Sequence, residues 1–255
     1  QAQMLPQGTP ALDPRAWHDE IAGAPTQMLT IGSTHLSGWP TPLAGALLEP
    51  LIERLVAFHP DVVTVENLSG EECAALTATP TLYADAAESY CWDASAAQHS
   101  TGQTLATARV AIAQQLRDWP AAPSPAQRRQ LTSLFLAANE RSSALVQWLQ
   151  LPAEEQHAGD GLDAAAVELM ATLRGRMNES YAVAAVVAAR LGLQRVMPVD
   201  NHTSDAVQAD MPAACSAAIT RMWQNPASAA LRADDQAAIA AVQDGNGMLG
   251  YYRSI

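Results

Sequence analysis

The sequence predicts an α/β fold, with a central and mostly parallel sheet, flanking helices and a large helical insertion. Short apolar runs that are typical of buried strands occupy residues 27–35, 61–67 and 193–201. Residues 42–60 separate the first two runs and carry apolar side chains at helical spacing. Because a strand–helix–strand unit with short connections forms a parallel pair, we expect the runs to lie in one parallel sheet.

The remaining elements follow in chain order. Residues 1–26 predict an irregular leader with a short helix near 13–23, and residues 27–255 predict a single α/β domain. The helical pattern from residue 71 onward is too long for one crossover, so we expect a helical insertion at about 71–175. The helices predicted after the second strand are 71–77, 81–98, 101–118, 125–149, 163–173, 177–191, 204–225 and 234–243.

Composition excludes several classes of function. The 255 residues can bury one sizeable core. A net charge of −12 without a basic stripe argues against nucleic-acid binding, because such a surface repels phosphate backbones. All 14 basic residues are arginine, which excludes a Walker-type phosphate loop and a Schiff-base lysine. No apolar stretch has the length of a membrane span.

The cysteines and the first residues of the chain give information on the cellular compartment of the protein. The cysteines, Cys73, Cys91 and Cys215, have no metal-ligand spacing. We expect Cys73 and Cys91 to be free buried thiols, with a disulfide between them as the alternative in an oxidising compartment. The polar, proline-containing start lacks an initiator methionine and favours a periplasmic or secreted protein after removal of a signal peptide, with a cytoplasmic location as the alternative.

Polar side chains follow each predicted strand. The first strand ends in "GSTHLS" with His35 and Ser37, the second in "VEN" with Glu66, and the third in "VDNH" with Asp200 and His202. Because the carboxyl ends of parallel strands share one edge, these groups are expected to meet in a crevice there. We expect His35, Glu66, Asp200 and His202 to bind a divalent metal such as Mn, Co or Zn, which would activate a water molecule.

Each of these ligands has a structural alternative. His35 would then cap a turn, Glu66 would pair with an arginine, Asp200 would be the N-cap of a following turn and His202 would be a surface histidine. The stretch "RGRMNES" adds Arg176, Asn178 and Glu179 at a junction of helices. An arginine beside a carboxylate suits an oxyanion or carboxylate site, whereas Asn178 and Glu179 also suit a helix start. A G-x-S-x-G elbow, which would indicate a serine hydrolase, is absent from the sequence.

Four of these anchors resemble, in order, a bacterial family that carries a domain of unassigned function and is distantly similar to the Tiki/TraB, ChaN-like and erythromycin-esterase-like group. The family pattern is a strand ending Gly-Thr-x-His, a strand ending Val-Glu, an Arg-Asn-Glu helix start and a strand ending Ile-Asp. The matching positions are Gly32 to His35, Val65–Glu66, Asn178–Glu179 and Val199–Asp200.

The resemblance implies an α/β fold with a central sheet and a helical excursion. In the Tiki branch it implies metal-dependent proteolysis by the Gly-x-x-His histidine and a glutamate. In the erythromycin-esterase-like branch it implies ester hydrolysis, and in ChaN-like members it implies haem binding. This chain departs from the pattern at Ser33, where threonine is common, and at Met177, where arginine is common.

The first functional hypothesis is a metal-dependent hydrolase that cleaves an ester or amide bond in a small-molecule or peptide substrate. Its catalytic residues would be His35, Glu66 and Glu179, and its substrate-binding residues would be Ser37, Arg176 and Asn178. The alternatives are a non-catalytic protein that binds haem or a small anionic ligand, with Tyr83 and Tyr90 as possible haem ligands, and an interaction module whose site has decayed.

Overall fold

The computed structural model of the chain describes residues 23–33, 35–39, 45–206 and 211–254. The chain divides into two compact units, Gln1–Gly32 and Ser33–Ile255. In the first unit, the described residues 23–32 contain neither helix nor strand. Most of the predicted leader and its short helix, residues 1–22, lie outside the described residues.

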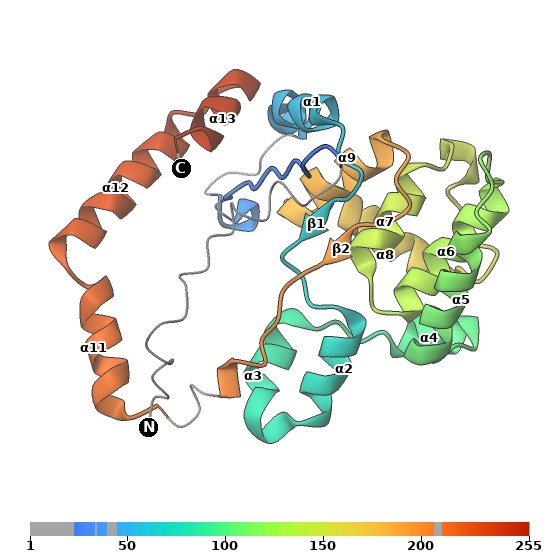
Figure 1. Cartoon of the computed structure of the whole chain (residues 1–255), viewed down its shortest axis with the longest axis horizontal. Coiled ribbons are helices and arrows are strands. Elements are labelled where there is room, and N and C mark those ends of the chain that lie inside the picture. The colour runs from blue at the N-terminus through green and yellow to red at the C-terminus, as the bar shows by residue number, and fades with distance from the viewer. Residues whose placement is uncertain (1–22, 34, 40–44, 207–210, 255) are drawn as a thin grey trace. The chain divides into compact units, whose positions relative to one another are not determined.

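The α/β prediction is wrong, because the described part of the second unit is mostly helical and has one small sheet. The sheet contains β1 (Thr64–Val65) and β2 (Met197–Pro198), which pair in parallel and lie side by side in Figure 1. The predicted strand at 27–35 is not formed in its described residues, where Met28 is 86% exposed. A strand needs a pairing partner and a buried face, and this apolar run has no ladder within the described residues.

Helices therefore make up the body of the second unit, and polar residues start several of them. Ser69, Thr104 and Ser124 each form a capping box. In chain order the helices are η2 (Leu36–Gly38), η3 (Gly45–Leu48), α1 (Glu49–Phe58), α2 (Gly70–Ala78), α3 (Pro80–Tyr90), α4 (Ser95–Thr101), α5 (Leu105–Arg117), α6 (Pro125–Ala137), α7 (Arg141–Leu149), η4 (Ala153–Glu155), α8 (Ala164–Gly175), the π-helix η5 (Ser180–Ala184), α9 (Ala185–Arg190), α11 (Ala213–Trp223), α12 (Pro226–Ala240) and α13 (Gly245–Tyr252).

The predicted helix 125–149 is two helices, α6 and α7, with a turn at Asn139. Asn139 has a φ of 61°, in the left-handed region that asparagine tolerates. The backbone N–H of Glu140 donates to the carbonyl of Phe135 at 2.8 Å, and that of Asn139 donates to the carbonyl of Leu136 at 3.0 Å. These bonds form a Schellman motif that ends α6 and starts α7 in a new direction. The predicted helix 81–98 is likewise split into α3 and α4.

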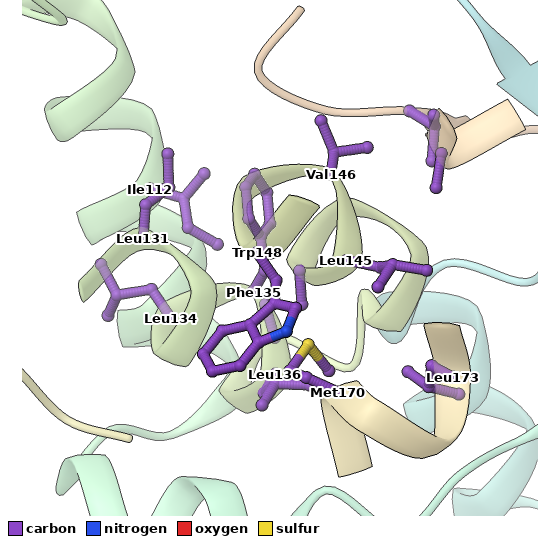
Figure 2. Packing of buried hydrophobic residues seen from close by; sticks show 14 of the residues in the cluster. Ile112, Leu131, Leu134, Phe135, Leu136, Leu145, Val146, Trp148, Met170 and Leu173 are labelled. Atoms are coloured by element: carbon purple, nitrogen blue, oxygen red, sulfur yellow. The ribbon is translucent and has the colours of Figure 1, made fainter. Parts of the chain in front are cut away.

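The main hydrophobic core surrounds α7, whose residues from Ser142 to Trp148 are all buried. α7 packs against α6, α8 and α9, and α6 packs against α4 and α5. Leu131 and Phe135 of α6, like Leu145 of α7, are fully buried in this cluster, part of which is drawn in Figure 2. The apolar residues that would have covered a central sheet are buried between helices instead.

Polar side chains of α7 and of its C-cap residue, Gln150, hold the chain segment that leads into β2. The Ser143 hydroxyl donates to the carbonyl of Val196 at 3.0 Å, and the Gln147 amide donates to the carbonyl of Gln194 at 2.6 Å. Gln150 donates to the carbonyl of Leu193 at 2.9 Å. Because buried polar groups are stable only when they are hydrogen-bonded, these bonds fix β2 against α7.

Two smaller clusters complete the core. α1, α9 and α13 meet around Leu48, Ile52, Val187 and Met248, with Leu36 of η2 in the same cluster. The sequence did not predict α13. Within the described residues no helix is long and apolar enough to cross a membrane, in agreement with the prediction.

The second small cluster lies between α2 and α3 and contains a disulfide between Cys73 and Cys91, with Cα atoms 5.5 Å apart. The expectation that both are free thiols is therefore wrong. The turn between α2 and α3 brings the end of α3 back to the start of α2, which the 18-residue spacing alone does not predict. Cys215 is exposed and free.

Candidate functional site

A polar cavity of about 80 Å³ lies next to the small sheet. Its wall is built from the residues that follow β1 and β2, the turn before α7, the first turn of α7, η5 and the end of α3. The polar residues that line it are Glu66, Asn67, Tyr90, Asn139, Glu140, Arg141, Ser142, Ser143, Tyr181 and Asp200. The crevice expected at the strand ends is therefore present as a cavity, although the sheet that borders it has only two strands.

Asn67 joins three elements in the wall of the cavity. Its side-chain amide donates to the hydroxyl of Ser142 on α7 at 2.9 Å. Its amide oxygen accepts from the hydroxyl of Ser180 on η5 at 3.0 Å. The backbone carbonyl of Asn67 accepts from Asp200 at 3.2 Å, which continues the pairing of the two strands. These contacts hold the walls in a fixed geometry before any ligand arrives.

Glu140 is buried in the wall and its charge is compensated. The carboxylate, whose side chain is 9% exposed, accepts two bonds from Arg195, at 3.1 and 2.9 Å. The Ser143 hydroxyl lies 3.2 Å from the same group. Burial raises the pKa of Glu140, while Arg195 and Ser143 oppose the rise. Glu140 and Arg195 therefore neutralise each other, and neither offers an unpaired charge to a ligand.

Arg141 is different, because its guanidinium has no hydrogen bond or ion pair within the described residues. Its central carbon lies 5.6 Å from the centroid of the Trp92 ring. Burial lowers the pKa of Arg141, and the nearby charge of Arg176 acts in the same direction. An arginine remains protonated at neutral pH, so the cavity wall carries an uncompensated positive charge.

The backbone beside Arg141 adds hydrogen-bond donors. Arg141, Ser142 and Ser143 form the first turn of α7 and all line the cavity. The side chain of the N-cap residue, Glu140, does not cap this turn. The first N–H groups of a helix have no acceptor within the helix and attract negative charge.

Glu66 and Asp200 line the same cavity, but only one of them has partners. The Asp200 carboxylate lies 3.1 Å from Nε2 of His202 and accepts from the backbone of Asn201 at 2.8 Å. The Glu66 carboxylate is exposed and forms no hydrogen bond or ion pair within the described residues.

His202 lies between two carboxylates. Its Nδ1 is 2.9 Å from Asp205, its Nε2 is 3.1 Å from Asp200, and its ring stacks on Tyr90 with centroids 4.3 Å apart. The hydrogen bond that His202 donates to the Asp205 carboxylate raises the pKa of His202, and Asp200 adds to the rise while burial opposes it. The imidazole thus holds the loop after β2 against α3.

The remaining predicted site residues do not line the cavity. Nδ1 of His35 is 3.9 Å from Oε1 of Glu179, and its side chain is 82% exposed. Glu179 accepts a bond of 2.6 Å from the backbone of Leu36. Asn178 accepts from the backbone of Ser180 at 3.0 Å, as a helix start would. The two others, Ser37 in η2 and Arg176 after α8, are exposed.

The predicted metal ligands do not fit a metal as they are arranged. Glu66 and Asp200 share the cavity and His202 contacts Asp200, whereas His35 pairs with Glu179 elsewhere. Both ring nitrogens of His202 face carboxylates, which leaves neither directed at a metal ion. In the described part of the chain no group of three or more His, Cys, Asp or Glu side chains has the geometry to hold one.

The haem alternative does not fit either. Tyr90 lines the cavity and stacks on His202, and the Tyr83 hydroxyl donates to the carbonyl of Thr203 at 3.1 Å. The volume of the cavity, about 80 Å³, is well below the several hundred Å³ of sites that hold larger ligands, so the cavity is too small for haem.

Sequence reasoning missed Arg141, Asn67 and Ser142, which matter most for the geometry of the cavity. The signal for Arg141 is the stretch "AANERSS", where an asparagine suited to a left-handed turn precedes polar residues that start a helix. Asn67 lies in the stretch "VEN", from which only the neighbouring Glu66 was predicted as a site residue.

A comparison with protein-family models, curated proteins and solved structures finds no significant match to this chain. The resemblance at the four sequence anchors therefore stays a prediction.

Proposed function

We propose that this protein binds a small anionic ligand, with a carboxylate or a similar oxyanion, in the polar cavity beside the sheet. The observation that carries the proposal is the guanidinium of Arg141, which lines the cavity without an anionic partner among the described residues. A partly buried cation without an anion is costly, and an anionic ligand would remove that cost.

The groups around Arg141 favour the binding of an anion over the binding of a cation. The free N–H groups at the start of α7 and the hydroxyl of Ser142 add donors to the guanidinium. The ring of Trp92 contacts the guanidinium, so its orientation is set in advance. Glu140 and Asp200 form no ion pair with Arg141, because Glu140 is bonded to Arg195 and Asp200 contacts His202.

The metal-dependent hydrolase stays a prediction from the sequence. It requires His35 and Glu66 at one centre, and the two residues lie in different clusters. Binding without catalysis requires only the residues that do meet in the cavity.

Isothermal titration of the whole protein with acetate, propionate, lactate, phosphate and sulfate tests the proposal. We expect at least one of these anions to bind the wild type. Arg141→Gln should weaken that binding by about 10- to 100-fold, since a hydrogen bond to a charged group contributes roughly 1.5–3 kcal/mol. Arg117→Gln, at an exposed position outside the cavity, is the matched control and should bind normally.

Two results would contradict the proposal. One is that no anion in the panel binds the wild type. The other is that Arg141→Gln binds as tightly as Arg117→Gln, which would locate the site elsewhere. Thermal unfolding of both variants shows whether a loss of binding reflects a loss of folding.

A further inference from the structure

Two unpaired groups of opposite charge line the same cavity. Arg141 contributes a guanidinium and Glu66 a carboxylate, and neither is hydrogen-bonded or ion-paired within the described residues. They also form no ion pair with each other, although a salt bridge would be favourable if the two groups could meet.

Their separation follows from the backbone elements that carry them. Glu66 directly follows β1, which is paired in register with β2 through Val65 and Pro198. Arg141 begins α7, whose position is fixed by the turn at Asn139 and by the buried residues of the helix. Asn67 follows Glu66 and its side chain is bonded to Ser142, which follows Arg141, so the backbone segments that carry the two groups are held together.

The other charged groups in the lining each contact a partner within the described residues. Glu140 is held by Arg195 and Asp200 by His202. The cavity therefore offers a ligand one free positive and one free negative group.

We infer that the ligand is a small zwitterion of the α-amino acid class, whose carboxylate binds Arg141 and whose ammonium group binds Glu66. This inference rests on the proposed function and adds a positively charged group to the anionic ligand proposed there. A cavity of about 80 Å³ takes such a molecule or the corresponding end of a larger one.

The physical reason for selectivity is that both free charges would be satisfied by one molecule. A simple carboxylate would satisfy Arg141 but would bring its own negative charge toward Glu66. A simple amine would satisfy Glu66 but would leave Arg141 unpaired. Repulsion by Glu66 therefore weakens the binding of a simple carboxylate, and a simple amine leaves the partly buried Arg141 without an anion.

Titration of the whole protein with L-alanine, propionate and ethylamine tests the inference, because these probes differ mainly in their charged groups. For the wild type we expect alanine to bind at least about tenfold more tightly than either of the other two. Glu66→Gln should reduce the affinity for alanine to that for propionate and should leave the affinity for propionate unchanged or improved. Asp61→Asn, which changes an exposed carboxylate outside the cavity lining, is the matched control.

The outcomes separate this inference from the proposed function. If propionate binds as tightly as alanine and Arg141→Gln abolishes both, the protein binds anions and the zwitterion inference fails. If Glu66→Gln binds alanine as the wild type does, the inference also fails. If neither probe binds, and the anion panel does not bind either, both proposals fail. Circular dichroism of each variant confirms that it is folded.

Discussion

The guanidinium of Arg141 lies over the ring of Trp92, with 5.6 Å between its central carbon and the ring centroid. The same turn that starts α7 also holds Trp92, because the side-chain amide of Asn139 donates to the carbonyl of Trp92 at 2.9 Å. Arg141 is therefore positioned from two directions, by the helix start and by an aromatic ring. A charged group that is positioned in advance loses little entropy when a ligand binds.

Replacing Trp92 tests this positioning. Trp92→Ala should weaken the binding of the tightest anion by roughly two- to 30-fold, since a cation–π contact contributes about 0.5–2 kcal/mol. Trp92→Phe keeps an aromatic face and should retain most of the affinity. Isothermal titration measures both. Equal affinities for the wild type and the alanine variant would show that the ring does not position Arg141.

Asn67 should be important for stability as well as for the site. Asn67→Ala leaves the buried hydroxyls of Ser142 and Ser180 without their partner, and we expect the free energy of unfolding to fall by about 1–3 kcal/mol. Gln243→Ala removes one exposed contact to the carbonyl of Ala240 and should change stability by less than about 0.5 kcal/mol. Urea denaturation measures both, and a similar small change in the two variants would argue against the bridging role of Asn67.

The disulfide between Cys73 and Cys91 should stabilise the α2–α3 pair. It closes a loop with a sequence separation of 18, for which chain entropy predicts about 3 kcal/mol. Reduction with dithiothreitol, or the double change Cys73→Ser and Cys91→Ser, should lower the melting temperature, while Cys215→Ser should not. Alkylation followed by mass spectrometry provides the decisive check. Finding every cysteine reactive in the unreduced protein would contradict the bond.

His202 should make stability depend on pH in a defined direction. Its pKa in the folded protein lies above the ordinary value of 6.5, so its contribution is full below that pH and is lost as the pH rises through the raised pKa. Denaturation of the wild type and of His202→Gln, from below pH 6.5 to above the raised pKa, should show a difference in the free energy of unfolding that is largest at acidic pH. His99→Gln, at an exposed position on α4, is the control. A difference that grows toward alkaline pH would contradict the assignment.

Local signals in the sequence predicted individual elements better than the fold. Polar caps and proline positions located helices such as α2, α5 and α8 to within a few residues. The runs at 61–67 and 193–201 do contain the paired strands, but each strand has only two residues. The run at 27–35 has the same apolar character, and its described residues form no strand. Whether an apolar run becomes a strand depends on a partner elsewhere in the chain, which local pattern does not specify.

The candidate site was predicted in part for the same reason. Glu66 and Asp200 were expected to meet because they follow parallel strands, and they do line one cavity. His35 was placed there because it was expected to end a strand of the same sheet, and it lies beside Glu179 instead. Arg141 was hidden inside an apparently continuous helix, since "LAANERSS" has good helical propensity on both sides of Asn139.

The most direct test of the account is to observe the side chain of Arg141 while an anion binds. In an NMR spectrum of the arginine-labelled protein, the Nε–H signal of Arg141 is assigned by its loss in Arg141→Gln. Titration with L-alanine or propionate should shift this signal in a saturable way and leave the signal of Arg117 unchanged. An unchanged Arg141 signal under conditions where calorimetry shows binding would contradict the central claim that this guanidinium receives the ligand.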